Sequence, residues 1–142
     1  MTTLKKKLAG MIPGHLVILD IVENIQQSKV TIIIDGIEPV DIQTTANITK
    51  NIQNSGLLDE IYKDGFRLEV TSPGLDAPLT HPIQFKKNMG KIVRVRQIGE
   101  LESSIVKIHD VNDKSFVALT IDGVKSHLLF DNIESAFVEI KF

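Results

Sequence analysis

The sequence contains no cysteine and no tryptophan, and only one tyrosine among its 142 residues. The missing thiols exclude disulfides, thiolate metal sites and a cysteine nucleophile, and they fit a reducing compartment such as the cytoplasm, where we expect the protein. No apolar run reaches the length of a membrane span, and the lysine-containing start lacks a long apolar segment. We therefore expect no membrane partner and no signal peptide. The formal net charge of −2 excludes a generic attraction to nucleic acid, so any such binding needs a local group of cations.

Signatures of catalysis and metal binding are missing as well. The four histidines are scattered without metal-ligand spacing, so roles at the surface or in the core are the simpler interpretation for His15, His81, His109 and His127. Ser72 lies outside any Gly-x-Ser-x-Gly elbow, and the proline after it removes one backbone N–H from an oxyanion hole. The sequence therefore predicts a protein that is not an enzyme and holds no metal and no cofactor.

The first half of the chain predicts a helix, two strands, a helix and a strand. Apolar residues at helical spacing near the start end at Pro13-Gly14, and runs rich in Val, Ile and Leu predict strands over 16–23 and 29–35. Asp41 is expected to N-cap the second helix and Gly56 to end it. This order predicts an α+β sandwich in which the helices cover one face of the sheet.

The second half predicts one short helix and then only strands. Pro82 suits the first turn of a helix through Asn88. Asp122-Gly123 predicts a two-residue type I′ hairpin, and 131–134 a single helical turn. Strands are expected over 91–97, 103–110, 115–121, 124–130 and 136–142. Five short strands with tight turns predict a small barrel, so the fold class is α+β with domains 1–80 and 81–142.

The stretch 66–79 joins these two halves. Phe66, Leu68 and Val70 alternate with polar residues, as expected for a half-buried strand. The strand runs into Ser72-Pro73-Gly74-Leu75, which predicts a type II turn with positive φ at Gly74. Asp76 can accept from nearby backbone N–H groups, and Pro78 disfavours the helical region for Ala77. The simpler interpretation of these residues is a structural turn and a hinge between domains.

A local group of cations follows the hinge. Between Ala77 and Gly99 there is no acidic residue, whereas five basic ones are present: Lys86, Lys87, Lys91, Arg94 and Arg96. On a strand, Arg94 and Arg96 project from the same face. Guanidinium groups bind phosphate bidentately, so these residues are candidates for RNA binding. The alternative is a solvated edge strand that guards against aggregation.

The segment Leu68–Leu79 reads Leu-Glu-Val-Thr-Ser-Pro-Gly-Leu-Asp-Ala-Pro-Leu. It resembles the signature of the ribosome maturation factor family RimP, in which Leu-Glu-Val-Ser-Ser-Pro-Gly precedes Leu or Ile and then Asp-Arg-Pro-Leu. Ala77 stands where the family usually carries arginine, so this chain lacks a cation there.

The resemblance implies an Sm-like, SH3-like barrel over 81–142 and a non-catalytic factor that binds the free small (30S) ribosomal subunit and assists its maturation. It also implies contact with ribosomal RNA and with a small-subunit ribosomal protein near the decoding region. We expect a monomer. Two alternatives stay open: an adaptor that binds a peptide in the barrel groove, and a small hydrolase built around Ser72. RNA-dependent, salt-sensitive binding would separate the assembly factor from the adaptor.

Overall fold

The computed structural model describes residues 3–139. The chain divides into two compact units at the bond between Pro73 and Gly74, and each unit has its own hydrophobic core. The proposed independence of segments 1–80 and 81–142 stays a prediction. Leu79 already packs in the second core, so a cut between Pro73 and Gly74 separates the two cores more cleanly.

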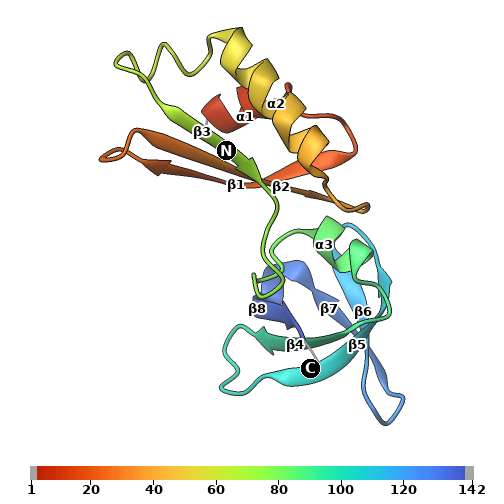
Figure 1. Cartoon of the computed structure of the whole chain (residues 1–142). Coiled ribbons are helices and arrows are strands. Elements are labelled where there is room, and N and C mark those ends of the chain that lie inside the picture. The colour runs from red at the N-terminus through yellow and green to blue at the C-terminus, as the bar shows by residue number, and fades with distance from the viewer. Residues whose placement is uncertain (1–2, 140–142) are drawn as a thin grey trace. The chain divides into compact units, whose positions relative to one another are not determined.

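The first unit has the predicted order of elements. It consists of α1 (Thr3–Ala9), β1 (Leu16–Asn24), β2 (Lys29–Gly36), α2 (Ile42–Ser55) and β3 (Arg67–Thr71). The sheet order is β1-β2-β3, with β1 antiparallel and β3 parallel to β2. Both helices lie over one face of this sheet (Figure 1), which confirms the predicted α+β layering.

The ends of α2 follow from two residues that the sequence indicates. The Asp41 carboxylate accepts a hydrogen bond of 2.7 Å from the backbone N–H of Thr44. Gly56 adopts φ of 73° at the C-terminal end, a left-handed conformation that glycine takes without steric cost. Between these caps, Ile48 and Ile52 are buried in the first core, so the helix is held by its apolar side.

The second unit contains one short helix and five strands. Its elements are α3 (Pro82–Lys87), β4 (Ile92–Gln97), β5 (Ser104–Val111), β6 (Ser115–Leu119), β7 (Lys125–Leu129), a 3₁₀ turn (Phe130–Asn132) and β8 (Ile133–Val138). The strand order is β7-β6-β5-β4-β8 and every neighbouring pair is antiparallel. Within residues 3–139 no pairing joins β7 to β8, so a closed barrel is not found. The last strand was expected to reach 142, and residues 140–142 lie outside the described part.

Two predicted turn types are wrong. Gly74 does not adopt positive φ; instead the N–H of Ala77 donates to the carbonyl of Gly74 at 3.1 Å, so the turn closes two residues later than predicted. The fixed φ of Pro73 also suits extended backbone, so a proline at this position does not by itself require the predicted turn. At the β6–β7 connection, Thr120 pairs with Val124 and only Gly123 has positive φ, 84°. This is a three-residue hairpin loop rather than type I′, which needs positive φ at both central residues.

Candidate nucleic-acid interface

The two arginines of the predicted basic group lie on β4 as the alternation indicates. Val93 and Val95 are buried in the second core, and Arg94 and Arg96 point to the opposite face. However, β4 lies between β5 and β8. The edge-strand alternative is therefore wrong, because the edges of this sheet are β7 and β8.

Each arginine is held by a glutamate near β8. Arg94 donates from Nη2 to Glu139 Oε1 at 2.9 Å and from Nε to Glu139 Oε2 at 3.3 Å, a bidentate pair. These hydrogen bonds lower the pKa of Glu139 and raise the pKa of Arg94. Arg96 Nη2 lies 3.9 Å from Glu134 Oε1, and its Nη1 donates to the Glu100 carbonyl at 3.2 Å. A phosphate would therefore compete with a carboxylate at both sites.

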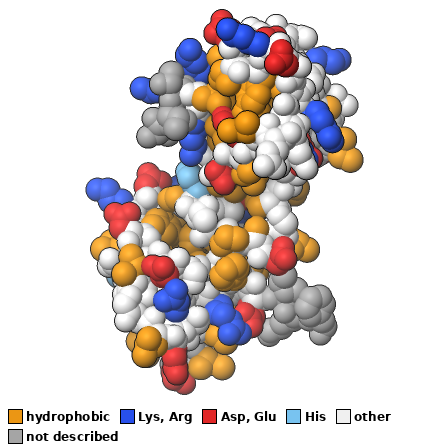
Figure 2. Space-filling view, turned by 90° about the vertical axis from the view of Figure 1, so that its left-hand side faces the viewer, with side chains coloured by type: hydrophobic (Ala, Val, Ile, Leu, Met, Phe, Trp, Pro, Cys, Tyr) orange, Lys and Arg blue, Asp and Glu red, His pale blue; other side chains and the backbone are white. Residues whose placement is uncertain are grey.

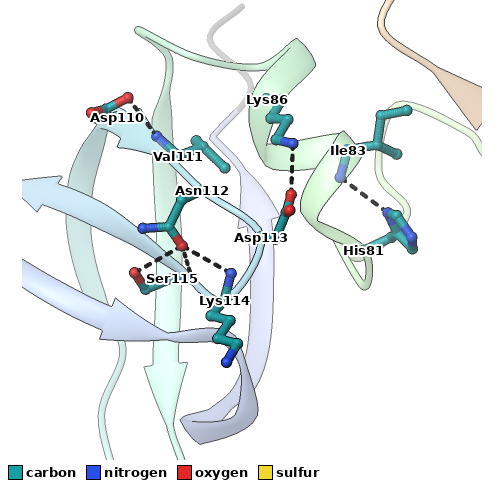
Figure 3. Close-up of polar contacts among 9 residues, drawn as sticks. All are labelled: His81, Ile83, Lys86, Asp110, Val111, Asn112, Asp113, Lys114 and Ser115. Atoms are coloured by element: carbon teal, nitrogen blue, oxygen red, sulfur yellow. Dashed lines mark hydrogen bonds and ion pairs between the residues drawn. The ribbon is translucent and has the colours of Figure 1, made fainter.

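Lys86 extends to the turn between β5 and β6, away from the outward face of β4. Its Nζ donates to Asp113 Oδ1 at 3.0 Å (Figure 3). That turn is itself ordered by Asn112, whose Oδ1 accepts from the backbone N–H groups of Lys114 and Ser115 at 2.8 Å each. The structure thus places the cation of Lys86 over a stiff, acidic hairpin tip.

The position of α3 is set by a capping box at its first turn. His81 Nδ1 accepts from the N–H of Ile83 at 3.0 Å (Figure 3). Gln84 Oε1 reaches back and accepts from the N–H groups of Thr80 and His81 at 2.7 and 3.0 Å. Gln84 is buried, and these two hydrogen bonds satisfy its side-chain oxygen there. His81, for which the sequence favoured a role at the surface or in the core, is therefore a structural cap.

The five predicted cations do not form one strip. Arg94 and Arg96 share a sheet face, Lys86 contacts the β5–β6 turn, Lys87 is half-buried, and Lys91 is exposed just before β4. On the face that Figure 2 shows, the second unit (the lower part) carries separate blue and red side chains among hydrophobic ones rather than one continuous basic patch. Three of these cations, Lys86, Arg94 and Arg96, are thus paired with carboxylates, and the five do not form one bare positive surface.

The residues of the predicted hinge are mostly at the surface. Ser72, Gly74, Asp76 and Pro78 are exposed and Pro73 is half-buried. Immediately after them, the N–H of Leu79 donates to the carbonyl of Ala136 on β8 at 2.8 Å. The end of the signature is thus fixed to the last strand of the second unit.

A groove lies beside β8 in the second unit. It has a volume of about 450 Å³ and is lined mainly by apolar side chains, including Leu79, Phe85, Phe130 and Phe137, with His81 and Glu134 as polar members. A groove of this size takes one or two side chains of a partner, and its lining favours apolar ones.

The described residues contain no group of three or more His, Asp or Glu side chains able to hold a metal ion. Among the same residues, no helix has both the length and the apolar character needed to cross a bilayer.

Fold and site together define a two-unit α+β protein, in which a mixed three-stranded sheet precedes an antiparallel five-stranded sheet with basic side chains on its outward face. The family model described as the RimP N-terminal domain matches residues 7–76. The ribosome maturation factor RimP of Mycobacteroides abscessus is 30% identical over 122 residues, which cover 81% of this chain and 64% of that protein. The chain belongs to the RimP family, and the resemblance of segment 68–79 is confirmed.

Proposed function

We propose that this chain is a non-catalytic ribosome maturation factor that binds the free small (30S) ribosomal subunit and assists its assembly in the cytoplasm. Membership of the RimP family carries the proposal, since the relative from Mycobacteroides abscessus is named a ribosome maturation factor. Such a factor needs no bond-making chemistry and no cofactor. A protein that binds one conformation of an immature particle better than the others shifts the population toward that conformation.

The proposal includes an Sm-like, SH3-like barrel for the second unit. Five short antiparallel strands in the order β7-β6-β5-β4-β8 support it, together with the tight turns that join β5 to β6 and β6 to β7. The two edge strands would have to approach each other to close such a barrel. Small-angle scattering cannot distinguish a closed barrel from an open sheet. Contacts between amide groups of β7 and β8 in an NMR spectrum would show that the barrel is closed.

Ribosomal RNA is the proposed partner of the second unit, through Lys86, Lys87, Lys91, Arg94 and Arg96. The pairs of Arg94 and Lys86 are partly exposed, and such surface pairs contribute little to stability. A phosphate can replace the carboxylate, because a guanidinium binds both with the same two-pronged geometry. Few exposed aromatic side chains accompany these cations, which favours contact with the RNA backbone over base stacking. A small-subunit ribosomal protein near the decoding region is the proposed protein partner.

Sedimentation tests the proposed function directly. The tagged chain, present as a monomer, should comigrate with free small subunits and be absent from complete ribosomes, since an assembly factor leaves before the subunits join. Comigration with complete ribosomes at equal occupancy would contradict an assembly role. Absence from all ribosomal particles would contradict ribosome binding altogether.

A second candidate function is supported by the groove beside β8. An adaptor would bind a peptide there through Phe130 and Phe137. Binding by such a groove is driven by apolar burial and responds weakly to salt. Binding through phosphates weakens steeply as salt increases. A salt titration of the complex therefore separates the two functions, and a flat response would favour the adaptor.

A further inference from the structure

One row of side chains crosses four strands on the outward face of the second sheet. Ile92 on β4 is opposite Lys107 on β5, Lys107 is opposite Leu119 on β6, and Leu119 is opposite Lys125 on β7. Residues directly opposite each other in a sheet project from the same face. The neighbours of Lys107 along the chain, Val106 and Ile108, are buried, so the row points away from the core.

The two lysines of this row differ from the arginines of β4. Lys107 and Lys125 are exposed, and within residues 3–139 no carboxylate forms an ion pair with either of them. Their cross-strand neighbours in the row are aliphatic, so the row itself contains no acidic group. Arg94, in contrast, forms an ion pair with Glu139. These two lysines can therefore bind a new anion without giving up a carboxylate partner.

The spacing suits an extended polyanion. Adjacent strands lie about 4.8 Å apart, so Lys107 and Lys125, two strands apart, are separated by roughly 10 Å at the backbone. Their four-carbon stems can spread or converge from there, which lets both ammonium groups reach one stretch of nucleic-acid backbone. Protein–protein interfaces are depleted in lysine and enriched in aromatic residues and arginine. The composition of the row, two lysines and two aliphatic residues, thus favours a nucleic-acid backbone over an acidic protein surface.

We propose that the row formed by Ile92, Lys107, Leu119 and Lys125 binds the phosphate backbone of ribosomal RNA, with Lys107 and Lys125 as the contacting cations. This inference rests on the proposed function and adds two residues to the contact set proposed above. Ile92 and Leu119, the cross-strand neighbours of the lysines, offer apolar surface along which the lysine stems can lie.

The test compares two variants with the same loss of charge. The double variant Lys107→Gln/Lys125→Gln removes the row's cations, and the control Lys50→Gln/Lys63→Gln removes two exposed lysines of the first unit. Binding of each to small subunits, and to small-subunit RNA freed of protein, is measured between about 50 and 200 mM salt. Each lost phosphate contact lowers the salt slope by about 0.7–0.9, so the slope of the row variant should fall by about 1.4–1.8. At 0.1 M salt that corresponds to an affinity loss of about 25- to 60-fold, with the control unchanged.

Three results would overturn the inference, and they are distinguishable. If the row variant has the wild-type fold by circular dichroism and binds with the slope of the control, the lysines are only solvated. If it loses binding to subunits but keeps full affinity for free RNA, the row contacts an acidic protein. If the wild-type chain itself binds neither subunits nor their RNA, the proposed function fails as well.

Discussion

Removing the cations of α3 and β4 without reversing them is the sharpest test of the proposed RNA contact. A glutamate in place of Arg94 would face Glu139, whose carboxylate now lies 2.9 Å from the guanidinium. Reversal at Lys86 would likewise face Asp113. Such variants would combine lost binding with new repulsion in the free protein. Glutamine keeps a polar side chain without introducing a negative charge, so it avoids this second effect. The variant is therefore Lys86→Gln/Lys87→Gln/Arg94→Gln/Arg96→Gln.

The magnitude follows from counterion release. Four phosphate contacts contribute about 2.8–3.6 to the salt slope, depending on whether the RNA is single- or double-stranded. At 0.1 M salt their loss should weaken binding by about three orders of magnitude. The variant has a second readout: without Arg94, the pKa of Glu139 should rise toward its ordinary value, which an NMR titration measures. Because Arg94 lowers that pKa, the pair stabilises the fold above the ordinary carboxylate pKa, and the contribution is lost as the pH falls through the folded-state pKa.

The matched control removes four exposed lysines of the first unit by the substitutions Lys6→Gln, Lys7→Gln, Lys50→Gln and Lys63→Gln. Both variants carry the same net charge, so long-range attraction to the particle is weakened equally. Only the variant of the second unit should show the reduced salt slope. If it folds normally and still binds small subunits with the wild-type slope, these cations do not contact RNA. Recognition would then have to lie elsewhere.

Three further predictions concern the fold and one titrating group. Gly56→Val should destabilise by about 1–3 kcal/mol because φ there is 73°, whereas Gly74→Val should cost clearly less; equal losses in urea melts would contradict the backbone assignment. Fragment 1–73 should keep cooperative unfolding, because its core is complete without the second unit, and a fragment with a coil spectrum would refute this. Burial, and then the charge and hydrogen bond of Glu23, raise the pKa of Tyr62, so its absorbance titration should lie above the ordinary value near 10 and move down in Glu23→Gln. The contribution of the neutral Tyr62 side chain to stability is present below about pH 10 and is lost as the pH rises through the folded-state pKa.

Local sequence patterns predicted the helices and strands because each of these elements is determined by its own residues. The cap of Asp41 and the left-handed Gly56 define α2 from within a 16-residue window. The alternation through Val93 and Val95 places Arg94 outward before any partner strand is known. Turn types were less accessible, since a proline at position 73 fits both a turn and an extended continuation.

Long-range register accounts for what the sequence did not reveal. Arg94 and Glu139 are 45 residues apart, and only the pairing of β4 with β8 brings them together. The alternation of β5 could have shown that Lys107 points outward. Its alignment with Lys125 depends on two successive strand pairings and on the irregularity between Ile108 and Asp110. Counting charges along the chain therefore overestimated how many of the predicted cations lack a carboxylate partner.

The place of β8 in its sheet has a consequence for the order in which the chain can fold. β4 has a neighbour on each side only after β8 has been synthesised, about 40 residues later. The hydrogen bond from the N–H of Leu79 to the carbonyl of Ala136 also forms only after β8 has been synthesised. While the chain is emerging, β4 thus presents an open edge with unpaired backbone groups, the condition under which strands aggregate or pair with the wrong partner. Its outward arginines repel a second copy of the same edge during that interval, before Glu139 arrives to pair with Arg94.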